Sequence, residues 1–493
     1  MNDTTTDDRS SEKLSFWHKF GFGLGDIYGG GSGVVISFYY LYFLTDVIRI
    51  NPALAGLVIL ISKVYDAITD PFEGILTDRT RTPLGRRRPY LLAGILLVFL
   101  SFFTLWYPVD FAVEWQRFVF VILAYLFFST VVSIVMTCYN ALASELTLDY
   151  DERTSVSSFR IFFSTFSSIL SAVLPLEIVK LFPTVRAGYI AMGLIFGAFF
   201  ALPFIATVVS TRERPEFQRP PEPFRLRRAF VEPFKVRTFV YALLMYLFAF
   251  VAMDAVSSIV IYFMKYFLLR GDEANYVSGT LLVAQVASLP FYVALSKRTS
   301  KKTGYVVGAL IWLATMLTSF LIVPQAPAFF IYVFAVLVGL GTGGIVVMIY
   351  AIFPDIPDVD ELKTGQRREG TYSALVTFMR KFSSALALFL VSNALALGGY
   401  VSPVEQVVDG VSRFVEQPQS DTFILVLRLI FVFIPIVFVG FALLFAARYP
   451  LTSDVHARLR RVLAVRRNDE PETDDVQQEA QALSRLLIGE TSE

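Results

Sequence analysis

Apolar runs of about 20 residues or more recur along the whole chain, and they constrain its fold more than any other feature. Of the 493 residues, 55% are hydrophobic and only 17% are charged, and the mean hydropathy is +0.59. The runs are rich in Leu and Phe and do not alternate strictly with polar residues, which favours helices over a membrane β-barrel. The sequence therefore predicts an all-α integral membrane protein.

The runs indicate about twelve transmembrane helices, which a polar linker divides into two six-helix halves. The predicted spans are 20–47, 52–77, 89–107, 117–145, 155–181, 187–209, 238–267, 275–296, 303–323, 328–352, 371–398 and 421–447. The predicted regions are the N-terminus 1–19, the N-terminal half 20–210, the linker 211–237, the C-terminal half 238–450 and the tail 451–493.

The distribution of Lys and Arg predicts how the helices are oriented. The connections 79–88, 211–237 and 297–302 are rich in basic residues, whereas 399–420 has only Arg413. Because cytoplasmic loops carry the excess of Lys and Arg, we expect the basic loops and both termini to be cytoplasmic. The polar N-terminus lacks the pattern of a cleaved signal peptide. We expect the protein to lie in the plasma (inner) membrane.

Short sequence echoes indicate that the two halves are related. One set recurs after 219 positions: Pro71, Phe72, Arg79, Thr80 and Gly85 return as Pro290, Phe291, Arg298, Thr299 and Gly304. A second set recurs after 216 positions: Phe162, Phe166, Ser167 and Ser168 return as Phe378, Phe382, Ser383 and Ser384. With an even number of helices per half, such repeats are parallel and pseudo-symmetric about the membrane normal, as in major-facilitator transporters.

Four ionisable residues share one face of the second predicted span, Lys63, Asp66, Asp70 and Glu73, within an arc of about 80°. Charge near the bilayer centre costs a few kcal/mol, so such residues usually line a pathway or an ion site. Asp66 and Asp70 are one helical turn apart and need a proton, a hard cation or a basic group such as Lys63 between them. With Thr69, they could ligate Na⁺ or Li⁺, or share one H⁺. The alternative is an internal salt bridge that holds helices together.

Two further acids fall inside predicted spans. Asp26 lies in a glycine-rich part of the first span, where it could form the polar floor of a substrate site or serve close helix packing. Asp254, in the seventh span, is a candidate for lining the cavity from the second half. Its alternative role is an ion pair with Lys265 or Lys381.

Other polar side chains in the spans suit a hydroxylated substrate. Arg160 presents a planar group of five donors that matches hydroxyl pairs or carboxylates. Tyr139 and Asn140 add aromatic and hydrogen-bonding surface, although core packing is the simpler role for an aromatic ring in so Phe-rich a chain. Lys381 could be a mobile counter-charge, and Arg380 beside it could reach an interface instead.

Charged loops follow the second and tenth spans. The first contains Asp78, Arg79 and Arg86, and the second contains Asp355 and Arg368. Because positive-inside bias explains these basic loops, we do not expect nucleic-acid binding; we expect ion pairs that form an inward gate. In the tail, 455–467 predicts an amphipathic helix on the membrane surface, and 476–487 predicts a second helix.

Four segments in the order 66–71, 78–89, 145–154 and 364–370 resemble the glycoside–pentoside–hexuronide:cation symporters, the melibiose permease family. The resemblance covers roughly residues 16–450. It implies a major-facilitator fold and secondary transport of a sugar, glycoside, pentoside or hexuronide together with Na⁺, Li⁺ or H⁺ by alternating access.

The resemblance also implies roles for single residues. Asp66 and Asp70 match the cation-binding acids of the family's second helix, and Lys63 matches a basic position one turn earlier. Arg160 matches the arginine that contacts sugar, and Lys381 matches a lysine of the eleventh helix near the cation site.

Departures from the family pattern concern the substrate more than the ion. Met136 replaces an aspartate of the fourth helix, Asn140 and Val346 stand where the family has tryptophans, and Gly30 aligns with a sugar-binding acid for which Asp26 is an imperfect stand-in. These departures argue against melibiose itself and leave Na⁺ less assured than H⁺ as the coupling ion.

We therefore expect a monomeric transporter with a small-molecule substrate, in contact with membrane lipid, and with no cofactor or metal beyond the coupling ion. A second hypothesis keeps the transporter but makes its cargo lipid-like or another non-sugar solute. A third is a membrane sensor whose tail binds a partner. An enzyme is not expected, because no nucleophile–base–orienter set or metal-ligand cluster is visible in the sequence.

Overall fold

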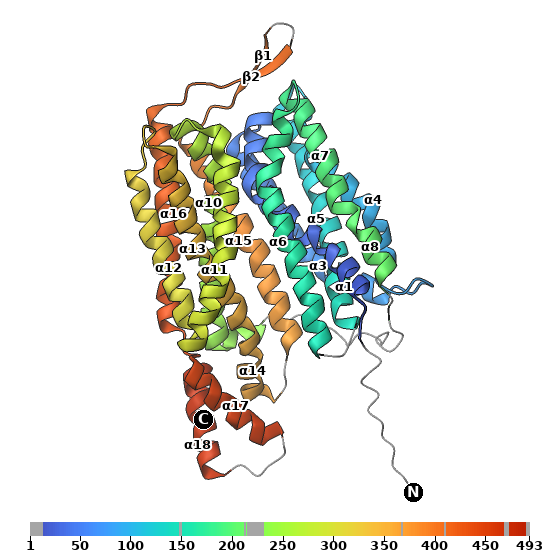
Figure 1. Cartoon of the computed structure of the whole chain (residues 1–493), viewed down its shortest axis with the longest axis vertical. Helices are drawn as coiled ribbons and strands as arrows, with labels where there is room; N and C mark the ends of the chain where they lie inside the picture. The colour runs from blue at the N-terminus through green and yellow to red at the C-terminus, as the bar shows by residue number, and fades with distance from the viewer. Residues whose placement is uncertain are drawn as a thin grey trace. The chain divides into compact units, whose positions relative to one another are not determined.

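The structure of the chain is a computed structural model, and it describes residues 13–146, 150–211, 213, 231–365, 368–408, 411–467 and 473–489. The chain forms two compact units, Met1–Glu222 with Val401–Pro418, and Pro223–Tyr400 with Gln419–Glu493. Helices make up nearly all of both units (Figure 1).

The elements of the first unit are α1 (Phe16–Leu24), α2 (Asp26–Val35), the π-helical turns η2 (Ile36–Tyr40) and η3 (Phe43–Val47), α3 (Pro52–Arg79), α4 (Arg88–Leu105), α5 (Glu114–Glu145), α6 (Tyr150–Lys180), α7 (Val185–Ala201), α8 (Pro203–Ser210), β1 (Val404–Val408) and β2 (Val411–Val415). The second unit contains η5 (Pro233–Lys235), α10 (Arg237–Tyr262), η6 (Phe263–Phe267), η7 (Gly271–Glu273), α11 (Ala274–Arg298), α12 (Lys301–Thr318), η8 (Ser319–Leu321), α13 (Ala328–Ile352), η9 (Phe353–Asp355), α14 (Ile356–Thr364), α15 (Glu369–Leu397), α16 (Asp421–Arg448), α17 (Ser453–Arg467) and α18 (Asp474–Leu487).

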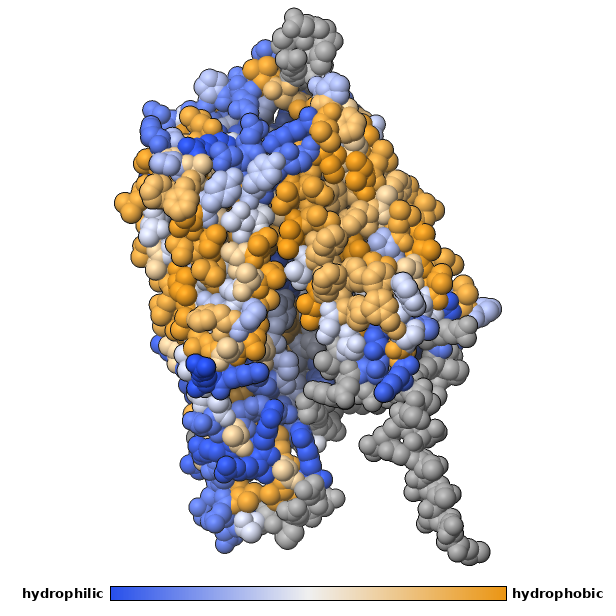
Figure 2. Space-filling view, viewed as in Figure 1, coloured by the Kyte–Doolittle hydropathy of each residue, from blue (hydrophilic) through white to orange (hydrophobic). Residues whose placement is uncertain are grey.

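Eleven segments among the described residues are long and apolar enough to cross a membrane. The predicted span 20–47 is the twelfth; it consists of α1, α2 and two π-helical turns, so it has no uninterrupted helix of spanning length. Large apolar side chains such as Phe72, Leu96 and Phe329 are exposed on these helices. Figure 2 shows a broad hydrophobic surface over the helices, as lipid contact requires. The prediction of an all-α integral membrane protein with about twelve spans is confirmed.

Glycine allows α2 to pack directly against α6. A Cβ on Gly30 would lie 2.3 Å from the Ser164 carbonyl oxygen, and one on Gly31 would lie 2.2 Å from Ser167 Oγ. Ser167 Oγ in turn donates to the Ile27 carbonyl oxygen at 2.7 Å. The glycines predicted to permit close helix approach therefore do so, because no larger residue would fit this contact.

The same backbone irregularity ends the first helix of each half. The π-helical turns η3 and η6 begin 220 positions apart, and each is followed by a non-glycine residue of positive φ, Arg49 at 61° and Leu269 at 57°. In both, the N–H of the residue after the turn closes on its first carbonyl at 3.0 Å, Ile48 to Phe43 and Leu268 to Phe263. Such strained positions are rare, and their recurrence at this spacing confirms that the halves are pseudo-symmetric.

A β-hairpin stands where the sequence analysis expected only a loop. Strands β1 and β2 pair antiparallel, with Val404 opposite Val415. The Phe414 ring lies 5.5 Å from the guanidinium of Arg49 and 5.8 Å from that of Arg186. Both arginines also pair with Asp110, at 3.4 and 2.8 Å. These contacts hold the hairpin in the first unit.

The two tail helices pack against each other and against α14 (Figure 1). The apolar side chains of α17, Leu459, Val462 and Leu463, are buried in this contact, as are Leu483 and Leu487 of α18. The predicted helix over 455–467 is therefore found as α17, but its apolar side chains are buried against protein instead of facing a membrane surface. The predicted helix 476–487 is found as α18.

Glu213 caps the start of α4. Its carboxylate accepts the backbone N–H groups of Arg86, Arg87 and Arg88 at 2.6, 2.7 and 2.8 Å. Gly85 adopts a φ of 104°, and a Cβ there would come within 2.5 Å of the carboxylate. A negative group at this helix end satisfies donors that no other turn of the helix can reach and complements the helix dipole.

We expect Glu213→Ala to lower the free energy of unfolding by about 1–3 kcal/mol, because three N–H donors lose a charged acceptor. Thermal unfolding of the purified full chain in detergent measures this as a lower Tm. Glu213→Gln is the matched control, since its amide oxygen still accepts hydrogen bonds but carries no charge. Its Tm should lie between that of the parent and that of Glu213→Ala. A Tm equal to that of the parent in both variants would contradict this role.

Candidate functional site

The acids of the second span face two serines on α5. Ser129 Oγ donates to Asp66 Oδ1 at 2.6 Å, and Ser133 Oγ donates to Asp70 Oδ1 at 2.5 Å. The two acids are one helical turn apart on α3, and the two serines are one turn apart on α5. The acids and serines therefore form two matching steps of a ladder. The sequence analysis missed Ser129 and Ser133. Their spacing of four residues inside an apolar span was the available signal.

Lys63 pairs with the buried acid of this site. Its Nζ lies 2.9 Å from Asp66 Oδ2, and Asp66 is only 2% exposed. The ammonium group also lies 5.7 Å from the centre of the Tyr125 ring. This ion pair lies within α3 between residues three apart, so it is not the salt bridge between helices that the alternative supposed, and Asp70 is a second carboxylate on the same helix.

Hydroxyl and carboxylate oxygens lie together where α3 packs against α5. Thr69 Oγ1 is buried, and among the described residues it has no hydrogen-bond partner. Together with Asp66, Asp70, Ser129 and Ser133 it offers oxygen ligands, the kind that hard cations take. Within the described part of the chain, no group of three or more His, Cys, Asp and Glu side chains could hold a metal ion. This set of oxygens suits a monovalent cation or a proton.

A second cluster brings together four of the predicted substrate residues. Arg160 Nε lies 3.0 Å from Asp26 Oδ2, and its Nη2 donates to Asn140 Oδ1 at 2.6 Å. The guanidinium lies over the Tyr139 ring at 4.7 Å, and the Tyr139 hydroxyl donates to the Phe22 carbonyl oxygen at 2.9 Å. The cluster combines donors, acceptors and an aromatic face, which is the chemistry that binds a hydroxylated ring.

Asp254 has a different partner from those predicted. Arg380 donates two hydrogen bonds to its carboxylate, from Nη1 to Oδ2 at 2.5 Å and from Nη2 to Oδ1 at 2.9 Å. The ammonium of Lys265 lies instead over the Tyr266 ring at 5.1 Å. The predicted pairing of Asp254 with Lys265 or Lys381 was therefore wrong, and so was the suggestion that Arg380 reaches for an interface. A planar fork on the facing helix reaches both carboxylate oxygens, which a single ammonium cannot do.

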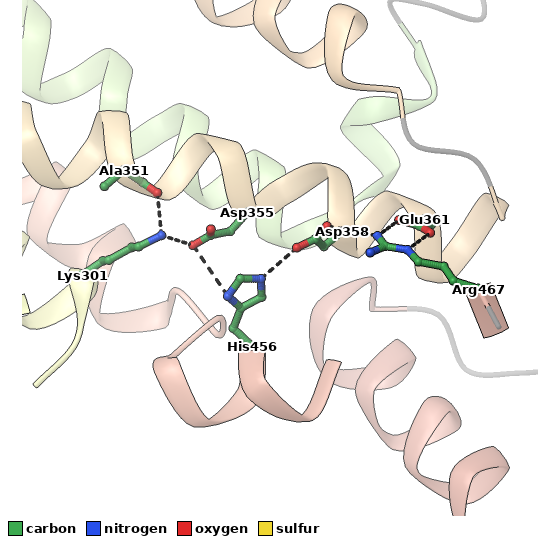
Figure 3. Close-up of polar contacts among 7 residues, drawn as sticks. All are labelled: Lys301, Ala351, Asp355, Asp358, Glu361, His456 and Arg467. Atoms are coloured by element: carbon green, nitrogen blue, oxygen red, sulfur yellow. Dashed lines mark hydrogen bonds and ion pairs between the residues drawn. The ribbon is translucent and has the colours of Figure 1, made fainter. Parts of the chain in front are cut away.

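The predicted gate residue Asp355 belongs to a network that includes the tail (Figure 3). Lys301 Nζ lies 2.5 Å from Asp355 Oδ2. His456 of α17 lies between two acids, with Nδ1 at 4.0 Å from Asp355 Oδ2 and Nε2 at 3.0 Å from Asp358 Oδ2. Farther along α17, Arg467 pairs with Glu361. The tail is thus fastened to α14 and to the turn before it.

Arg368 joins three segments of the second unit. Its Nε and Nη2 donate to the two oxygens of Asp360 at 2.7 and 2.6 Å, and its Nη1 pairs with Glu232. The hydrogen bonds to Asp360 are the main reason why the pKa of the Arg368 guanidinium is raised above its usual range. Asp360 is 0% exposed, and Arg368 supplies its counter-charge.

The gate residues of the first unit are partly visible. The Asp78 side chain lies outside the described residues, so its predicted pairing with arginine stays a prediction. Arg79 is exposed at the end of α3. Arg86 is buried, and its backbone N–H donates to Glu213. Here the acid that holds the basic loop is Glu213, which the sequence analysis did not single out.

Comparison with known proteins matches this chain to transporters. The family model described as "MFS/sugar transport protein" matches residues 21–453. An uncharacterized symporter of Synechocystis is 28% identical, covering 93% of this chain and 98% of the relative. The isoprimeverose transporter of Lactiplantibacillus pentosus is 25% identical, covering 78% of this chain and 81% of the relative. The sodium-dependent lysophosphatidylcholine symporter 1-A of Danio rerio is 22% identical, covering 94% and 91%.

Solved structures support the same fold. The inward-open xylose transporter XylE of E. coli superposes with a TM-score of 0.60 at 14% identity, covering 88% of this chain and 96% of that chain. At this identity the likeness concerns the fold alone, and it is the major-facilitator fold that the sequence predicts.

We expect Arg368→Met to destabilise the second unit by about 3–5 kcal/mol, because it leaves the buried Asp360 carboxylate without its counter-charge. Thermal unfolding of the full chain measures the loss. The matched control is the double variant Arg368→Met with Asp360→Asn, which removes both charges and should recover much of the stability. A double variant no more stable than Arg368→Met alone would show that the pair is not what holds these segments.

Proposed function

We propose that this chain, which belongs to the MFS/sugar transport family, is a cation-coupled symporter of a sugar or glycoside in the plasma membrane. The observation that carries the proposal is the ladder of Asp66 and Asp70 against Ser129 and Ser133 inside the spans. Symporters among its relatives, including one with a sugar cargo, agree with it. As the sequence predicts, we place both termini and the basic loops on the cytoplasmic side.

The charges of the ladder suggest the stoichiometry. Lys63, Asp66 and Asp70 together carry a formal charge of −1, which one Na⁺, Li⁺ or H⁺ neutralises. Met136 removes the acid that the resemblance places on the fourth helix, and the serines of α5 supply neutral oxygens instead. We therefore propose one monovalent cation per transport cycle, with Thr69 as a further ligand.

The Arg160 cluster is the proposed sugar site of the first half. Its donors and acceptors, Arg160, Asp26 and Asn140, match the paired donor and acceptor character of sugar hydroxyls. Tyr139 offers a ring face beside them. If the cation and the sugar stabilise the same conformation, each raises the affinity for the other by the same factor. We also propose that the ion pairs of Asp355 and Arg368 form part of the inward gate.

A second candidate function is symport of a lipid-like solute. The relative named as a lysophosphatidylcholine symporter covers 94% of this chain, more than the sugar transporter does. Uptake of a labelled pentose or glycoside against that of a labelled lysophospholipid, in vesicles that contain the full chain, separates the two. Cation-stimulated uptake of the lipid alone would replace the sugar proposal.

We expect Asp66→Asn and Asp70→Asn each to abolish cation-stimulated uptake while the purified protein stays folded, because each removes a carboxylate from the cation site. Uptake into vesicles with and without a Na⁺, Li⁺ or pH gradient is the measurement. Asp475→Asn is the control, since that acid is exposed on the tail helix α18 and lies outside the spans, and it should keep the stimulation. Full stimulation in both Asp66→Asn and Asp70→Asn would refute the assignment.

The serines separate a metal cation from a proton. We expect the double variant Ser129→Ala with Ser133→Ala to weaken Na⁺ or Li⁺ dependence roughly tenfold, because two hydroxyl partners of the site are lost. Proton-driven uptake should change far less, since a carboxylate binds H⁺ without other ligands. The half-saturating cation concentration and the pH profile report the two cases. An unaltered cation dependence would remove the serines from the site.

A further inference from the structure

His456, in the first turn of the tail helix α17, lies between two acids of another segment of the same unit. Its Nε2 is 3.0 Å from Asp358 Oδ2, and its Nδ1 is 4.0 Å from Asp355 Oδ2 (Figure 3). The side chains of the histidine and of Asp355 are each 13% exposed, and that of Asp358 is 8% exposed. Both ring nitrogens therefore face a carboxylate in a contact that is largely shielded from water.

The protonated ring suits this arrangement better than the neutral ring. An imidazolium carries two N–H donors, whereas a neutral imidazole carries one donor and one acceptor. If the neutral ring donates to Asp358, its other nitrogen turns a lone pair toward Asp355, whose carboxylate also only accepts. A proton on the ring replaces that repulsion with an attraction and strengthens the hydrogen bond to Asp358. Histidine gains such a proton between about pH 5 and 8.

The charges around the ring favour one more positive group. From α12, Lys301 Nζ lies 2.5 Å from Asp355 Oδ2. From the end of α17, Arg467 pairs with Glu361 and lies 3.6 Å from Asp358 Oδ1. These three acids and two bases carry a formal charge of −1, and an imidazolium brings the sum to zero.

Two neighbouring titratable groups keep their charge near neutral pH. After α16, burial and the charge of Asp355 hold the pKa of the Tyr449 hydroxyl well above its ordinary value, so the tyrosine stays neutral. From α18, Glu479 accepts hydrogen bonds from Arg458, which lower the pKa of this glutamate, so it stays ionised. The imidazole is therefore the group at this contact that changes charge in that range.

The ring also holds the tail more firmly than the ion pair at the other end of α17 does. Arg467 is 47% exposed, and an ion pair that is open to water contributes little, about 0–1 kcal/mol. His456 and its two acids are nearly covered, so solvent screens their attraction far less. The apolar side chains of α17 remain buried in either state of the ring, so a change of its charge loosens the tail without removing it.

We propose that His456 is a proton-operated latch, which fastens α17 to Asp355 and Asp358 when the ring is protonated and loosens when the ring is neutral. Because the two acids favour the protonated ring, its contribution is complete at the acidic end of the range and is lost as the pH rises through it. The latch goes beyond the proposed symport, which uses neither this histidine nor the tail. It acts on that symport through Asp355, which belongs to the proposed inward gate.

Hydrogen exchange of the purified full chain in detergent tests the latch without any substrate. Protection factors of the α17 amides, which correct for the intrinsic pH dependence of exchange, report how often this helix opens. One linked proton changes the opening equilibrium by at most about tenfold per pH unit, so we expect a fall of at least about threefold from about pH 6 to about pH 8. Amides of α6, in the other unit, should not change and serve as the reference. Protection of α17 that stays level or rises overturns the inference.

Variants assign the pH dependence to this ring. His456→Gln takes up no proton, so α17 should show at every pH the lower protection that the parent shows near pH 8. His456→Lys keeps a positive charge throughout and should remove the pH dependence while protecting α17 more than His456→Gln does. His18→Gln is the matched control, because the other histidine of the chain lies on α1 beside Ser15, and it should behave as the parent does. A pH dependence that survives in His456→Gln overturns the inference.

Uptake into vesicles tests whether the latch acts on transport. The external pH is fixed, and the pH on the side where we place the tail is set to about 6 or about 8. We expect the ratio of parent uptake to His456→Gln uptake to be at least about twofold lower at the acidic value, because the latch then holds Asp355. An unchanged ratio rejects regulation of the gate. Absence of cation-stimulated uptake in both proteins, with the expected exchange results, would reject the symporter proposal and leave the latch standing.

Discussion

The cost of placing charge inside a lipid bilayer governs the ion pairs within the spans of this structure. Asp66, Asp254 and Asp26 lie within the spans, and each is held by a basic side chain from the same half. Burying a carboxylate without a counter-charge costs several kcal/mol. The pairs thus allow the helices to carry chemistry at all. They also confine that chemistry to three places, so the candidate sites could be found by following the charges.

The sequence predicted features that lie within one helix better than those that join two. The spacing of Lys63, Asp66 and Asp70 is set by the helix alone, and the ion pair between the first two follows from it. Ser129 and Ser133 belong to another helix, and only the packing register of α3 on α5 brings them to the acids. The pair of Asp254 and Arg380 spans 126 positions, and no local pattern chooses Arg380 over the adjacent lysine.

Other failures came from signals that competed with each other. Asp409-Gly410 between two valine-rich runs is a strong hairpin pattern, but the sequence analysis considered only the basic residues of this connection. The tail helix α17 has the amphipathic pattern of a membrane-surface helix, and that pattern does not reveal whether lipid or protein covers the apolar face. In this chain α14 and α18 cover it. The sequence did not predict the role of Glu213 in the charged linker. That role depends on three backbone N–H groups, whose positions a sequence does not show.

The hairpin changes how many times the chain passes from one unit to the other. A linker alone would join the two units by a single crossing, but residues Val401–Pro418 return to the first unit between two helices of the second. The chain therefore crosses from one unit to the other three times. One of these crossings follows directly on Gly399, whose φ of 78° turns the chain after α15. The contacts of Phe414 with Arg49 and Arg186 therefore assign to the first unit a segment that lies, in the sequence, between two helices of the second.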